Sequence, residues 1–171
     1  MRVNTSIDAK LCINVANAYL DTAIYCDKTD RKTSHQTLQF SCNAFFSVPE
    51  ATNLAFACEL YLKAISVYCS SGGVSRSHNL FCLFKELPLQ QQTELEELFL
   101  KYNSYPSVTL GSTLEKHAKV FEEWRYIYEY PNRKATHTYE VYIDNLLAAA
   151  KTLQAYISKR TSLVKTQVGA V

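Results

Sequence analysis

The chain has 171 residues, of which 47% are hydrophobic and 20% charged, and its formal net charge at pH 7 is +2. These values are typical of a single domain over residues 1–171, and the near-balanced charge gives no electrostatic argument for a nucleic-acid or acidic partner. No stretch approaches eighteen consecutive apolar residues, and the first ten residues lack the apolar segment of a secretory signal. We therefore expect a cytoplasmic protein with no membrane partner.

The first predicted helix runs from Ile7 to Lys28, with an apolar residue every three or four positions. The sequence TDRKTSHQT follows and indicates a polar, exposed connection. The next segment, LQFSCNAFF, fits either a strand-like stretch or a helical turn, and the periodicity of residues 29–47 does not separate the two.

A long central helix is predicted from Ser47 to the Gly72-Gly73 stop. Ser47 and Glu50 have the spacing of a capping box, and Pro49 would fall in the first turn. This helix is apolar on most sides, which is typical of the middle of a bundle. Its remaining polar strip holds Glu59 and Lys63, four residues apart, and we expect another charge or a ligand to satisfy this pair.

Four further segments have helical patterns. A short helix covers 78–88, and a fourth helix covers 89–103 with Glu94, Glu96 and Glu97 in water. A fifth helix opens with a capping box of Ser112 and Glu115 and ends near Pro131, and its inward row comprises Leu114, His117, Phe121, Trp124 and Tyr128. A final helix spans residues 138–160, and we expect 161–171 to be frayed. Low Gly and Pro content and four long helical seams predict an all-α, up-and-down four-helix bundle with additional short helices.

Metal and cofactor chemistry have little support in the sequence. The four histidines are scattered, and no metal-binding spacing or Gly-rich phosphate loop is present. Cys12, Cys26, Cys42, Cys58, Cys69 and Cys82 are far apart in the chain, and most lie on predicted apolar faces, which favours reduced thiols. His117 stands on an apolar row, and we expect it to be a hydrogen-bonded core histidine. We therefore expect no metal site and no cofactor.

The segment WRYIYE contains the strongest candidate site. Arg125 lies one turn from Glu122 and one turn from Glu129, which is consistent with a solvated ladder of charges along the helix. Arg125 also lies beside Phe121 and Tyr128, and an arginine among aromatic side chains is suited to holding a phosphate. A basic rim could extend from it through the residues just past Pro131: Arg133, Lys134 and His137.

Three strings, NLAFACELYLKAI, SHNLFCLFKELP and VFEEWRYIYE, resemble in their order and spacing the HEPN superfamily of small all-α domains, above all its bacterial stand-alone members. The resemblance covers most of the chain from Ala51 onward. It implies an antiparallel helical bundle that forms a homodimer and acts on RNA, often in defence, toxin–antitoxin or stress systems. In active members an arginine and a histidine, with four to six residues between them, cut RNA without a metal.

Arg125 occupies the place of that arginine, but the matching histidine positions hold Tyr130, Pro131 and Asn132. The first hypothesis is therefore a HEPN-like dimer that binds RNA, a nucleotide or a protein partner encoded by a neighbouring gene. The candidate binding residues are Arg125, Tyr126, Arg133, Lys134, Glu59, Lys63 and His78.

The alternative hypothesis is a metal-independent ribonuclease that uses Arg125 with Glu129 or His137. In both cases we expect Arg125 near the two-fold axis of the dimer, with Glu59 or Lys63 close to Arg125 or Glu129.

Overall fold

The computed structural model describes residues 7–34, 43–69, 75–124 and 141–168. Every regular element in these ranges is a helix, so the all-α prediction is confirmed. The elements are α1 (Ala9–Ser34), α2 (Asn43–Cys69), α3 (Leu80–Lys85), α4 (Leu89–Phe99), α5 (Leu110–Lys116), α6 (Val120–Trp124) and α7 (Ile143–Val168). Among these residues no helix combines the length and hydropathy that crossing a bilayer requires.

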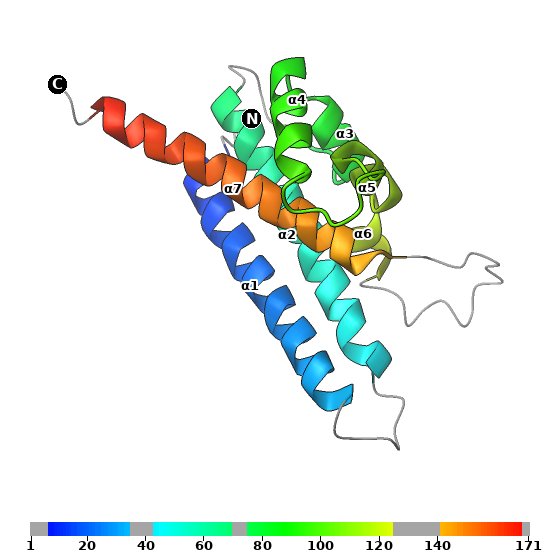
Figure 1. The fold of residues 1–171 in the computed structure, drawn as a ribbon. Coiled ribbons are helices and arrows are strands. Elements are labelled where there is room, and N and C mark those ends of the chain that lie inside the picture. The colour runs from blue at the N-terminus through cyan, green and yellow to red at the C-terminus, as the bar shows by residue number, and fades with distance from the viewer. Residues whose placement is uncertain (1–6, 35–42, 70–74, 125–140, 169–171) are drawn as a thin grey trace, which may run out of the picture.

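Helix α2 is the centre of the molecule and packs against α1, α3, α6 and α7 (Figure 1). Its predicted inward row is confirmed at Leu54, Cys58, Tyr61 and Ile65, which are fully buried. Burial strongly raises the pKa of the Cys58 thiol, which therefore acts as a small apolar core residue. Tyr68, at the end of the same row, is exposed.

One partly buried polar contact joins the three long helices. The Oδ1 atom of Asn17 on α1 accepts a hydrogen bond from the Tyr61 hydroxyl of α2 at 2.7 Å. The same oxygen accepts a second hydrogen bond from Nε2 of Gln154 on α7 at 2.8 Å. Fully buried alanines lie on all three helices: Ala16, Ala55, Ala149 and Ala150.

The ends of the first two helices differ from the prediction. Helix α1 continues to Ser34 through the segment expected to be a polar connection. Helix α2 begins at Asn43, so Ser47 and Glu50 do not form its N-terminal capping box, and Pro49 lies inside the helix. The capping-box spacing and the preference for proline in the first turn depend only on neighbouring residues. They are outweighed here by the packing of α2 against α1, because most helical stability comes from tertiary burial. The rest of the ambiguous segment, 35–42, and the Gly72-Gly73 stop lie outside the described residues.

The predicted fifth helix is broken in two. Thr109, not Ser112, is the N-cap of α5: its side chain accepts a hydrogen bond from the Ser112 backbone, and Ser112 reciprocates in a capping box. Helix α5 ends at Lys116 with His117 as its C-cap, and α6 begins at Val120. The break follows from the His117 side chain, which bonds to the Thr113 carbonyl and to the Tyr142 N–H, as predicted for a core histidine. The side chain of Trp124 and residue Tyr128 lie outside the described residues.

Helix α7 also departs from its predicted limits. It begins at Ile143 and continues to Val168, so much of the segment expected to be frayed is helical. Its predicted seam is confirmed by the full burial of Leu146, Ala150, Leu153 and Ile157. Helix α4 ends at Phe99, four residues before the expected Asn103. The carbonyls of Leu98 and Phe99 accept hydrogen bonds from N–H groups only three residues on, in turns that end the helix.

Candidate functional site

The structure describes three of the predicted site residues, namely Glu59, Lys63 and His78. The others lie outside the described residues: Arg125, Tyr126, Glu129, Arg133, Lys134 and His137. The expected proximity of Glu59 or Lys63 to Arg125 or Glu129 therefore stays a prediction.

Glu59, Lys63 and His78 form a single cluster beside the central helix. One oxygen of Glu59, Oε1, is 2.8 Å from Lys63 Nζ and 2.9 Å from His78 Nδ1. Glu59 is only 1% exposed, and Lys63 is also buried. The predicted i,i+4 pair is thus confirmed, and His78 is its additional partner.

The contact with Glu59 determines which ring nitrogen of His78 carries the hydrogen. An ionised carboxylate can only accept hydrogen bonds, so Nδ1 of His78 carries the hydrogen that faces Oε1. Nε2 is then a hydrogen-bond acceptor when the ring is neutral, and the His78 side chain is 52% exposed. The charges of Glu59 and Lys63 cancel, so protonation of His78 would give the cluster one net positive charge.

The second oxygen of Glu59 is unusual. Oε2 is buried and has no hydrogen-bond partner among the residues that the structure describes. An unsatisfied buried acceptor costs about 1–3 kcal/mol, and more when it is charged. Such groups are rare in folded proteins and are often found at functional sites.

The backbone around His78 is held in place on both sides. The Asn79 side chain caps α3 by accepting a hydrogen bond from the Cys82 N–H at 2.9 Å. The next residue, Leu80, donates its N–H to the Ala118 carbonyl in the turn between α5 and α6. His78 therefore faces Glu59 from a segment tied to α3 and to the α5–α6 turn.

Helix α6 is fixed against the same central helix by aromatic stacking. The rings of Phe56 on α2 and Phe121 on α6 are parallel, with centroids 4.3 Å apart, and Tyr19 of α1 meets Phe56 edge-on. Phe121 lies four residues before Arg125, and Phe56 lies three residues before Glu59.

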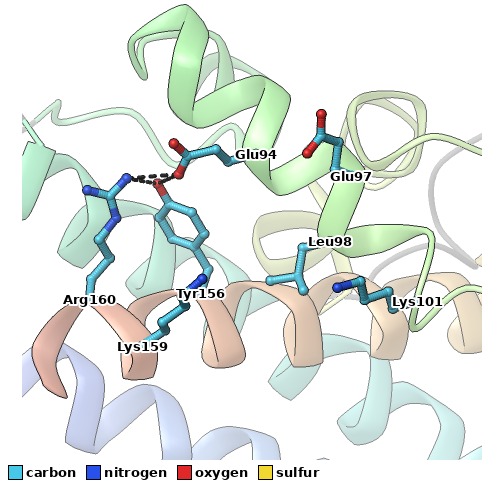
Figure 2. A pocket seen from close by; sticks show the side chains of 7 residues that line it. All are labelled: Glu94, Glu97, Leu98, Lys101, Tyr156, Lys159 and Arg160. Atoms are coloured by element: carbon cyan, nitrogen blue, oxygen red, sulfur yellow. Dashed lines mark hydrogen bonds and ion pairs between the residues drawn. The ribbon is translucent and has the colours of Figure 1, made fainter. Parts of the chain in front are cut away.

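A second charged group, which sequence reasoning missed, lies between α4 and α7 (Figure 2). The Tyr156 hydroxyl and one Arg160 nitrogen both donate to Glu94 Oε2, at 2.9 and 2.8 Å. The same Arg160 nitrogen also donates to the Tyr156 oxygen at 2.9 Å. These hydrogen bonds lower the pKa of Glu94, with the Tyr156 hydroxyl as the largest cause.

This triangle forms one wall of a pocket of about 440 Å³. Its other lining side chains are Glu97, Leu98, Lys101 and Lys159. From the sequence, Glu94 was expected to face water and Arg160 to sit in the last turn of its helix. The helical pattern places Tyr156 and Arg160 four apart on one face of α7, which is the signal that could have suggested a site there.

No group of three or more metal-binding side chains occurs within the described part of the chain. Comparison of the chain with protein-family models, with characterised protein sequences and with solved structures finds no match.

Proposed function

We propose that this chain is a HEPN-like helical domain that forms a homodimer and binds RNA or a nucleotide, with a neighbouring gene product as a further candidate partner. The observation that supports this best is the Glu59–Lys63–His78 cluster, in which a buried ion pair holds a half-exposed histidine. Defence, toxin–antitoxin and stress systems are the settings that the resemblance implies.

Buried ion pairs are costly to desolvate and are often less stabilising than apolar packing of the same volume. Placing one on the central helix is more readily explained if the cluster acts on a ligand. The fixed Nδ1–H leaves His78 Nε2 available to a ribose hydroxyl or base amino group, and the protonated ring would attract phosphate.

The alternative function is a metal-independent ribonuclease that uses Arg125 with Glu129 or His137. One observation favours this ribonuclease. Cleavage through the 2′-hydroxyl needs a group that takes a proton, and the sequence around Arg125 lacks the expected histidine. A histidine oriented by a buried carboxylate, as His78 is by Glu59, is suited to that role.

Binding and cleavage of a fluorescently labelled single-stranded RNA in EDTA test both functions. The variants are Arg125→Ala and His78→Gln, and the control is Lys85→Ala, which removes an exposed charge from α3. A gel shift with intact RNA that both site variants weaken and the control preserves supports the binding module. Cleavage that both site variants abolish supports the ribonuclease.

RNA that is neither bound nor cut by the purified protein would contradict both functions. Binding that Lys85→Ala weakens as much as the site variants would show that the contact is non-specific and owes nothing to this cluster.

A further inference from the structure

We infer that the pocket between α4 and α7 is a binding site for the phosphate group of a nucleotide, separate from the Glu59 cluster. The pocket is lined by side chains of α4, of the turn after it and of α7, whereas the cluster belongs to α2 and the segment before α3. This site goes beyond the proposed function, because none of its residues takes part in that proposal.

The pocket brings three cations together from two elements. Lys101 follows α4, and Lys159 and Arg160 are neighbours on α7. Neither lysine forms an ion pair with any residue that the structure describes. In Figure 2 the two lysines flank Leu98, and the Glu97 carboxylate points away from them. A phosphate at either lysine would form a charge-assisted hydrogen bond, although Glu97 also lines the pocket.

Arg160 is the fixed member of the group. Its hydrogen bonds to Glu94 and Tyr156 use one guanidinium nitrogen, so other N–H donors remain for a ligand. Holding the arginine in place before binding reduces the entropy that a ligand must overcome. Glu94 and Glu97 offset two of the three cationic charges, so the lining keeps one formal positive charge, and Arg160 supplies directed hydrogen bonds.

The floor of the pocket suits the remainder of a nucleotide. Leu98 offers apolar surface beside the cations, whereas Tyr156 is only 6% exposed and its ring lies against the Arg160 guanidinium, 5.3 Å from the ring centroid. Burial and the hydrogen bond to Glu94 raise the pKa of Tyr156 to about 12, so its hydroxyl stays protonated. A volume of about 440 Å³ lies within the usual range of small-ligand sites, roughly 300–1,000 Å³. Phosphate on the lysines and a sugar or base against Leu98 is the arrangement that these surfaces favour.

Calorimetric titration with AMP, adenosine and inorganic phosphate tests the site. We expect AMP to bind more tightly than either fragment. The double variant Lys101→Ala/Lys159→Ala should weaken AMP binding by about tenfold or more, since two charge-assisted contacts are lost. The matched control is Lys85→Ala/Lys119→Ala, which removes two exposed lysines outside the pocket and should leave AMP affinity unchanged.

A free nucleotide and the end of an RNA chain present the same phosphate, and a second titration distinguishes them. It compares one RNA with a 5′-phosphate and the same RNA with a 5′-hydroxyl. Tighter binding of the phosphorylated RNA that the double variant removes assigns the site to RNA ends, and AMP binding without this difference assigns it to free nucleotides.

The inference is overturned if neither AMP nor the 5′-phosphate binds, or if the double variant binds them as the wild type does. Its failure is distinguishable from failure of the proposed function. RNA binding that depends on His78 and Arg125 can persist when Lys101 and Lys159 have no effect on AMP binding. Conversely, AMP binding that depends on Lys101 and Lys159 can persist when His78 and Arg125 have no effect on RNA binding.

Discussion

His117 is held in its neutral form by two backbone groups. Its Nδ1 must donate to the Thr113 carbonyl, 2.7 Å away, because a carbonyl can only accept. Its Nε2 accepts the Tyr142 N–H at 3.0 Å, and a second proton there would face that N–H. Burial is the largest cause of the lowered pKa of His117, and the charge of Lys116 adds to it.

This arrangement predicts a loss of stability in mild acid. In the unfolded chain His117 takes up a proton near its ordinary pKa of about 6.5, whereas the folded chain does so only at lower pH. The unfolded state then binds more protons, so the contribution of His117 is complete above about pH 6.5 and is lost as the pH falls below it.

Urea midpoints at pH 7.5, 6.5 and 5.5 measure this effect. We expect the wild-type midpoint to fall over this range, and His117→Gln to have a lower midpoint at pH 7.5 but a smaller decline with pH. An equal decline in both proteins would show that other groups cause the acid sensitivity.

At the scale of elements, Glu96 of α4 determines where α5 begins. Its two carboxylate oxygens accept the N–H groups of Leu110 and Gly111 at 2.7 and 2.8 Å. A Cβ on Gly111 would lie 3.1 Å from Glu96 Oε1, so glycine permits this close approach. A negative charge at a helix N-terminus is also favourable.

Glu96→Gln should therefore destabilise the protein by about 0.5–2 kcal/mol, the usual range for losing a cap, since an amide offers one acceptor oxygen where the carboxylate offers two. Glu97→Gln is the matched control, because Glu97 is the exposed neighbour on the same helix. Chemical denaturation that ranks Glu97→Gln as equally destabilising would contradict the capping role.

Glu96 also explains why the sequence predicted the buried seams of the helices better than the residues at which the helices begin and end. Leu146, Ala150, Leu153 and Ile157 recur with the helical period, and burial follows from that period alone. Ser112 with Glu115 and Thr109 with Ser112 both satisfy the spacing of a local cap. The choice between them depends on Glu96, which is distant in sequence and belongs to another helix.

The candidate sites likewise contain contacts within one helix, which the sequence predicts, and contacts between distant elements, which it does not. The Glu59–Lys63 contact was predictable because four residues on a helix bring two side chains together. The contact of His78 with Glu59 and that of Arg160 with Glu94 join elements far apart in the chain, and composition or periodicity carries no signal for such pairs.

At the scale of the whole molecule, aromatic surface remains in contact with solvent. Five tyrosines within the described residues are more than 40% exposed: Tyr25, Tyr68, Tyr102, Tyr105 and Tyr142. Tyrosine is enriched at protein interfaces because it combines a large apolar ring with a polar end. The homodimer that the family resemblance implies stays a prediction, and these tyrosines are candidates for its interface.

Sedimentation velocity at micromolar concentration should therefore give a dimer of about twice the 19.5 kDa chain mass. If Arg125 lies near the two-fold axis, Arg125→Glu should shift the equilibrium in a salt-dependent way, because the charges of the two copies interact across the axis. Lys85→Ala should sediment as the wild type does. A monomer at this concentration would contradict the dimer and any site shared across it.

The single Asn17 oxygen that joins α1, α2 and α7 has a consequence for the uniqueness of the fold. Alanine-lined helices have smooth surfaces, and sliding one along another by a turn would keep much of their apolar contact. A slide of even one residue moves a helix by about 1.5 Å and would break the hydrogen bonds of the partly buried Asn17 to Tyr61 or Gln154. A buried asparagine fixes the alignment of coiled coils in the same way. An apolar residue at position 17 would therefore allow alternative helix registers, even in a bundle that resists denaturation equally well.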